Sequence, residues 1–297
     1  MYSQIDSNKR KTIFLITVFL AFIIALGWFF GVYMDYGYGM FILAVVIAII
    51  MSLGGYYKGD KVALVASRAK QIAKEDNPYV YRMVENLSIT SGIPTPKVYL
   101  IVSPALNAFA TGRDPEHASI ALTAGIINTL ENEELEGVIA HEMSHIKNYD
   151  IRIMTIVVVL VGAIALLSNI FFRARLFGLG GKKNSSGRGS GGQLNLIIMI
   201  VGMVLLVLSP IIAELIKLAI SRKREYLADA SGALLTIYPE GLARALEKIS
   251  QSTEPLKTAS TATAHLFIAN PLKGKTMMKF FSTHPPIEER ITKLRSM

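Results

Sequence analysis

The chain contains no cysteine among its 297 residues. This absence excludes disulfide bonds and thiolate metal sites, so any transition metal must be bound by histidine, aspartate or glutamate. Histidine is also scarce, since the chain has only five. Two histidines at a spacing typical of metal ligands are therefore informative.

Charged residues are few as well. They make up 18% of the chain, whereas ordinary soluble proteins have about 25%. Hydrophobic residues make up 52%, and this surplus predicts a protein that contacts the lipid bilayer. The net charge of +9 comes from basic residues that flank apolar runs, as the positive bias of cytoplasmic membrane flanks would produce. Because no basic face is interleaved with aromatic residues, we predict no nucleic-acid partner.

Four uncharged apolar runs are long enough to cross a bilayer, which takes about 20 residues. They cover residues 12–34, 36–57, 153–172 and 194–213. The first run is too long for a signal peptide and is followed at once by the second, so residues 1–58 are predicted to form a transmembrane hairpin. Basic residues precede and follow this pair, which predicts that both of its ends face the cytoplasm.

Residues 151–220 are predicted to form a second hydrophobic hairpin with a Gly/Ser-rich linker. The linker carries five basic residues between positions 173 and 188. That charge conflicts with a linker outside the cytoplasm. A spanning hairpin, a re-entrant hairpin and a helical hairpin buried in a soluble domain therefore all stay open.

The remaining segments, 59–150 and 221–297, are predicted to be two parts of one mixed domain. Short apolar runs at 97–102, 107–111 and 118–123 are typical of strands. A helix is expected to begin with Asn132 as its N-cap, followed by acidic residues that suit a helix N-terminus. Further helices are expected from 221, over 240–249, and from about 286.

The strongest chemical signal is the pattern His-Glu-Met-Ser-His at 141–145. On a helix, residues four apart lie on one face, so His141 and His145 can bind the same cation. Glu142 is then placed to take a proton from water activated by the metal. This pattern is typical of zinc peptidases.

A catalytic zinc site needs a third protein ligand. Asn148 and Ile151 stand where a metzincin would have Gly and His, so that class is excluded. Glu225 is the best remaining candidate, with Asp229 one helical turn later as a partner for a ligand imidazole. By spacing alone, Glu225 could equally be a solvated charge beside neighbouring arginines.

Two further roles follow from peptidase chemistry. The tetrahedral intermediate needs a donor for its oxyanion, and His284 and His265 are candidates, although a single histidine in a loop is more often only a polar surface residue. Peptide substrates can add a strand to an exposed sheet edge, and Asn107, Ala108 and Phe109 are the segment we nominate.

Four segments together resemble the HtpX-type membrane-bound zinc metalloproteases, which are related to the CAAX prenyl proteases. They are NAFATG at 107–112, EELEGVIAHEMSHIKNYD at 133–150, SRKREYLADA at 221–230 and FSTHPPIEERI at 281–291. The resemblance implies an α+β zincin-like (gluzincin-type) metallopeptidase domain combined with transmembrane helices. It also implies one Zn²⁺ per subunit bound by His141, His145 and Glu225, with Asp229 in support and His284 near the metal.

By this resemblance, we expect a multi-pass protein of the bacterial plasma membrane with a cytoplasmic active site. Its expected function is protein quality control under stress, and its expected partners are the bilayer and misfolded membrane proteins or unfolded proteins. The sequence predicts no oligomeric state.

The sequence also allows three alternative functions. A CAAX-type prenyl-peptide protease shares the motifs but typically has more spans than the four counted here. An intramembrane protease is disfavoured because charged residues flank the His-Glu-x-x-His pattern. A non-enzymatic metal transporter should carry ionisable residues within its spans. Only Glu214 and Lys217 lie at or inside one, and they can pair with each other.

Overall fold

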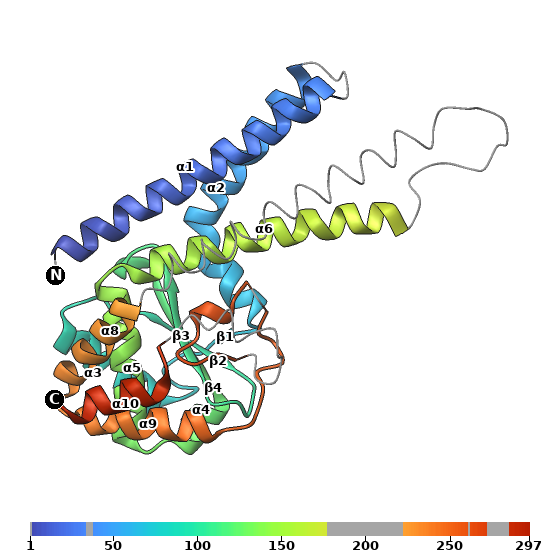
Figure 1. Cartoon of the computed structure of the whole chain (residues 1–297). Helices are drawn as coiled ribbons and strands as arrows, with labels where there is room; N and C mark the ends of the chain where they lie inside the picture. Colours follow the sequence, from blue (N-terminus) through green and yellow to red (C-terminus); the bar gives the residue numbers. More distant parts are fainter. Residues whose placement is uncertain (1, 34–37, 177–221, 261, 272–284) are drawn as a thin grey trace.

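The computed structural model describes residues 2–33, 38–176, 222–260, 262–271 and 285–297. A mixed α/β domain forms one end of the molecule, and helices α1, α2 and α6 project from it (Figure 1). The apolar run at 194–213, the Gly/Ser-rich linker and His284 lie outside the described residues.

The domain is built on a four-stranded sheet with the order β1-β2-β4-β3. The strands are β1 (Lys70–Gln71), β2 (Lys97–Ile101), β3 (Ala108–Gly112) and β4 (Ala118–Thr123). Strands β2 and β4 are parallel, whereas β1 and β3 run antiparallel to their neighbours. The strand order places β3 at one edge of the sheet. The short η1 (Pro115–His117) joins β3 to β4. Three strands fall within a residue of their predicted bounds, and β1 is an addition.

Helix α5 (Asn132–Lys147) is the central helix of the domain. Apolar side chains on it, including Leu135, Val138 and Ile139, are fully buried in the core that also contains Ile120 and Leu122 of the sheet. Other helices complete the domain: α3 (Pro78–Ser91), α4 (Ala124–Thr129), α8 (Arg222–Thr236), α9 (Pro239–Gln251), η2 (Ala264–Leu266) and α10 (Ile287–Arg295).

The start of α5 differs from the prediction. Its N-cap is Glu131, and Asn132 is the first helical residue. The side chain of Glu134 accepts a hydrogen bond from the backbone N–H of Glu131 at 2.9 Å, the reciprocal contact typical of a capping box. The side chain of Asn132 instead accepts from the hydroxyl of Tyr79.

The three projecting helices are α1 (Tyr2–Tyr33), α2 (Tyr38–Ala66) and α6 (Asp150–Leu176). They pack together through buried apolar side chains such as Leu15, Phe19, Ala48 and Val157. Large apolar side chains on their outer faces stay exposed, including Phe14 at 60% and Ile50 at 63%. Exposed apolar surface of this extent is typical of helices that face lipid.

Among the helices in the described part of the chain, α2 meets the length and hydropathy expected of a membrane span, over Phe41–Ala66. It runs past the predicted boundary at residue 58 into the sheet domain. There Ala63 and Leu64 pack with Phe109 of β3 and Met154 of α6. The helical bundle and the sheet domain therefore share a continuous apolar contact.

Candidate metal centre

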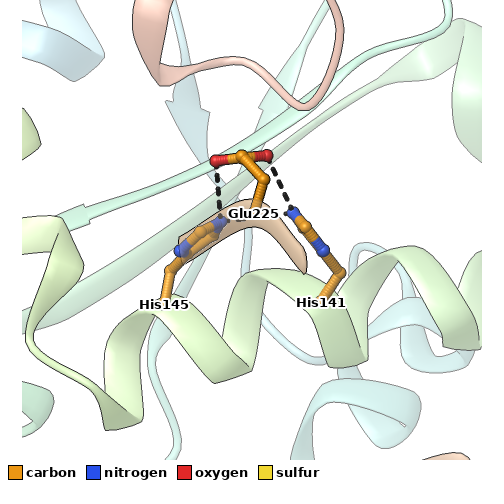
Figure 2. Close-up of side chains that lie close together, drawn as sticks. All are labelled: His141, His145 and Glu225. Carbon is orange, nitrogen blue, oxygen red and sulfur yellow. Dashed lines mark hydrogen bonds and ion pairs between the residues drawn. The ribbon is translucent and has the colours of Figure 1, made fainter. Parts of the chain in front are cut away.

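Helix α5 places His141 and His145 on one face, as expected for residues four apart on a helix. His141 and His145 lie one turn apart and are buried, and their Nε2 atoms are 3.2 Å apart. Glu225 reaches them from α8, with Oε2 3.9 Å from Nε2 of His141 and Oε1 3.7 Å from Nε2 of His145. Figure 2 shows the carboxylate facing both rings. The structure therefore brings together the three ligands that the sequence proposed, from two separate helices.

This donor set fits a divalent metal. Two ligands at about 2.0–2.1 Å from a tetrahedral zinc lie about 3.3 Å apart, close to the separation of the two Nε2 atoms. In a neutral imidazole whose Nδ1 donates to a carboxylate, Nε2 carries no proton, so the two facing Nε2 atoms are both free to bind a cation. The three side chains form a group able to hold an ion, and nitrogen and carboxylate donors suit zinc among other divalent metals.

Asp229 orients the first histidine. Its Oδ1 lies 2.9 Å from Nδ1 of His141, so the imidazole donates there and keeps Nε2 for the metal. Burial lowers the pKa of His141, while the contact with Asp229 acts in the opposite direction. The neutral ring that metal binding requires is therefore the favoured form.

Asp229 is itself held by a buried arginine. Arg290 of α10 is fully buried and donates from Nε and Nη2 to the two oxygens of Asp229, at 2.8 and 2.7 Å. Burial acts to raise the pKa of Asp229, but the charge of Arg290 and the hydrogen bonds from His141 and Arg290 together outweigh it and lower the value to about 2. Arg290 also donates to the carbonyl of Ile268 and lies 3.8 Å from Glu225. It therefore neutralises a carboxylate-rich site.

Asp150 has the same role for the second histidine. Nδ1 of His145 donates to Oδ2 of Asp150 at 3.1 Å, and Asp150 is 2% exposed. Burial lowers the pKa of His145, but the hydrogen bond to Asp150 and the charges of Glu225, Asp150 and Glu142 together outweigh it and raise the value to about 9. A metal that binds His145 must therefore displace a proton.

Glu142 lies next to the edge of the sheet. It is 2% exposed, and burial raises its pKa to about 7 despite the opposing charge of His145. The backbone N–H of Ala110 in β3 donates to its carboxylate. A carboxylate with a pKa near neutrality is suited to both accept and donate a proton.

Two glycines let the neighbouring helices approach α5. A Cβ at Gly232 of α8 would lie 3.0 Å from the backbone nitrogen of His141, and one at Gly137 would lie 2.8 Å from that of Leu242 in α9. The close crossing of α5 and α8 is what places Glu225 opposite the histidines.

The proposed substrate strand lies at the edge of the sheet, but its first residues already have partners. The carbonyl of Ala108 accepts from the N–H of Ile268 at 3.0 Å, and Asn107 donates to the carbonyl of Ala269. The ring of Phe109 is buried against Phe267. A peptide that paired at Ala108 would therefore have to displace Ile268.

Of the two remaining histidine candidates, His265 lies in the described part of the chain. His284 lies outside the described residues. His265, in η2, is 2% exposed, and its Nε2 lies 3.0 Å from the carbonyl oxygen of Met154 in α6. That nitrogen therefore serves the packing of η2 on α6.

Sequence reasoning missed Asp150 and Arg290. Asp150 comes five residues after His145, a spacing that would not share a face in one continuous helix. The helix breaks at Tyr149, which has a φ of 60° and turns Asp150 back toward the histidine. For Arg290 a signal existed, because it falls among Ile287, Ile291 and Leu294 on the apolar side of α10.

Comparisons with known proteins agree with this geometry. The chain matches peptidase family M48 over residues 74–297. It is 43% identical over 297 residues to a "Protease HtpX homolog" of Caldanaerobacter subterraneus, covering 100% of this chain and 98% of that protein. A protein of the same name from Streptococcus uberis is 43% identical with full coverage of both chains. One from Syntrophobacter fumaroxidans is 46% identical over 95% of this chain and 98% of the relative.

The fold also has a counterpart among solved structures. The crystal structure of S. mikatae Ste24p superposes with a TM-score of 0.51 at 20% identity, covering 99% of this chain and 67% of that one. The comparisons confirm the resemblance to HtpX-type proteases and exclude the transporter alternative. The chain is a membrane metalloprotease that belongs to peptidase family M48.

Proposed function

We propose that this protease is a zinc endopeptidase that cuts misfolded or damaged membrane proteins at the cytoplasmic face of the plasma membrane. The observation that carries the proposal is the group formed by His141, His145 and Glu225, with buried Glu142 beside it at the sheet edge. The donor set favours one zinc ion per chain.

The chain's own residues have distinct tasks in peptide hydrolysis. When bound, zinc would lower the pKa of water and polarise the scissile carbonyl. The carboxylate of Glu142 takes the proton that water releases and later gives it to the leaving amine. Asp229 and Asp150 hold the two imidazoles so that each keeps Nε2 toward the metal.

The proposed substrate class follows from where the site lies. Helix α6 begins at Asp150, which contacts His145, and continues into the apolar bundle. Substrates held in the same membrane would therefore be close to the site. We propose that residues 1–58 cross the bilayer as a hairpin and that the sheet domain is cytoplasmic, in agreement with the basic residues that flank this hairpin.

The activity can be tested with protein purified in detergent and supplied with zinc. We expect cleavage of unfolded casein by the wild type and a loss of about 10²- to 10⁴-fold in kcat for Glu142→Gln. Bound zinc should be retained, because Glu142 is not a ligand. Glu133→Gln, an exposed change on the same helix, is the matched control and should leave cleavage unchanged. Equal cleavage by Glu142→Gln and wild type would contradict the proposal.

A second substrate separates this function from a CAAX-type activity. A farnesylated peptide ending in a CAAX sequence is offered in the same assay. We expect casein and an unfolded membrane protein to be cut and the prenyl peptide to be left intact. Cleavage of the prenyl peptide alone would favour the CAAX-type alternative.

A further inference from the structure

A residue of the first helix holds the turn between α5 and α6. Asn8, on α1, is 2% exposed. Its Nδ2 donates to the carbonyl of Asn148 at 2.9 Å and to Oδ1 of Asp150 at 2.8 Å. An amide nitrogen has two N–H bonds, so these contacts use its full donor capacity. Asn8 therefore ties α1 to both sides of the turn.

Asp150 connects this contact to the metal centre. While Oδ1 accepts from Asn8, Oδ2 accepts from Nδ1 of His145. Arg224 of α8 lies farther away, with Nη1 3.5 Å from Oδ1. A buried carboxylate must have its oxygens satisfied. The donor from α1 thus fixes which oxygen faces the histidine and how that ring is held.

The backbone of the turn also depends on outside contacts. Tyr149 has a φ of 60°, which is unfavourable for a residue with a Cβ. Asn8 bonds to the carbonyl just before it, and Nζ of Lys9 lies 5.3 Å from the centre of its ring. Two consecutive residues of α1 therefore stabilise the turn that places Asp150.

We propose that Asn8 is a positioning residue for the metal centre, and that the centre has its full affinity for metal only while α1 is docked on the sheet domain. Asn8 lies outside residues 74–297, which match the peptidase family, so the matched segment lacks this donor. The inference rests on the proposed metal site. It adds that an apolar helix of the membrane-associated bundle supports the ligand geometry.

The test measures metal affinity in the full-length protein in detergent. Zinc is titrated against a competing chelator, and the visible absorption of the cobalt-loaded protein reports the ligand geometry. Asn8→Asp replaces the donor with a carboxylate facing Asp150 and should weaken zinc binding by about 10- to 100-fold. Asn8→Ser keeps one short donor and should weaken zinc binding less than Asn8→Asp does. This second variant provides the test if the carboxylate at position 8 prevents folding.

Thr12→Val is the matched control. Thr12 is also buried on α1, and its hydroxyl donates to the carbonyl of Asn8 within the same helix, away from Asp150. The zinc affinity and the cobalt spectrum of the Thr12→Val variant should equal those of the wild type. A loss in Thr12→Val as large as that in Asn8→Asp would mean that α1 acts only through general stability, and would overturn the inference.

An exchange of donor and acceptor gives the sharpest outcome. In the double variant Asn8→Asp with Asp150→Asn, the amide at 150 can donate to the carboxylate at 8 while its oxygen accepts from His145. We expect the double variant to bind zinc more tightly than the product of the two single losses predicts. If the loss of zinc affinity in the double variant equals the product of the losses in the two single variants, the inference is overturned. Wild-type protein that binds no zinc would instead refute the proposed function, whereas tight binding by both wild type and Asn8→Asp would refute this inference alone.

Discussion

At the scale of single residues, Arg290 is the cation on which the first histidine's support depends. It is fully buried and makes two hydrogen bonds to Asp229, which in turn accepts from His141. Removal of one partner from such a pair leaves an uncompensated buried charge. The cost should therefore appear both in stability and in metal binding.

We expect Arg290→Met to lower the free energy of unfolding by about 3–5 kcal/mol, and to weaken zinc binding by about 10- to 100-fold. Thermal unfolding of the metal-free protein and a chelator competition would measure the two effects. Arg295→Met is the control on the same helix, because Arg295 pairs with Glu240 and Glu247 at the surface. Because this ion pair is exposed to solvent, Arg295→Met should lower the free energy of unfolding far less than Arg290→Met does. Equal effects of the two changes would contradict this account.

The sequence predicted the ligands better than their supports. His141 and His145 are visible because a helical repeat alone places them on one face. Asp229 is visible for the same reason, one turn from Glu225. Asp150 and Asn8 are not, since their contacts arise from a turn with a left-handed residue and from the docking of α1, which no local pattern encodes.

At the scale of elements, the crossing of α5 and α8 sets the ligand geometry. Glu225 and Gly232 lie two turns apart on α8, and Gly232 rests directly on the backbone of His141. A larger residue there must push the helices apart, and that movement would carry the carboxylate away from the two imidazoles.

Gly232→Ala is expected to destabilise the protein by about 1–3 kcal/mol, because its Cβ overpacks the crossing. Zinc affinity should fall as well, although no ligand is altered. The change is followed by thermal unfolding and zinc titration, with Leu234→Ala as the control. Leu234 lies on the same helix and is 79% exposed. Its replacement by alanine should therefore change the free energy of unfolding by no more than about 0.5 kcal/mol. Unchanged stability and zinc affinity in Gly232→Ala would show that the crossing tolerates a methyl group.

The elements themselves were largely predictable. Apolar runs between turn residues predicted the bounds of β2, β3 and β4 to within one residue. The acidic residues near its N-terminus predicted where α5 begins to within one residue. The N-cap was misassigned because Glu134 reaches back to Glu131, an interaction between residues that also suit a helix interior. The partner of β3 at its outer edge, the segment around Ile268, comes from a distant part of the chain and has no local signal.

At the scale of the whole molecule, the apolar bundle and the sheet domain form a continuous structure. Buried side chains of α2 and α6 pack against β3, and α6 starts at the residue that supports His145. Figure 1 shows the bundle projecting away from the sheet domain. The arrangement agrees with a catalytic domain held at the membrane surface.

The proposed topology can be mapped by chemical labelling, because the chain has no native cysteine. Single cysteines are introduced at the exposed positions Lys74, Lys257 and Tyr38. An impermeant maleimide should label the first two from the cytoplasmic side only and the last from the outside only. Labelling of all three from the same side would mean that α1 and α2 do not cross the bilayer.

The most direct test of the account is the position of the metal in the full-length protein. Crystals grown with zinc are measured just above and just below the zinc absorption edge. We predict one anomalous peak per chain, about 2.0–2.2 Å from Nε2 of His141, Nε2 of His145 and a carboxylate oxygen of Glu225. A peak elsewhere, or a bound zinc that Glu225 does not contact, would contradict the central claim.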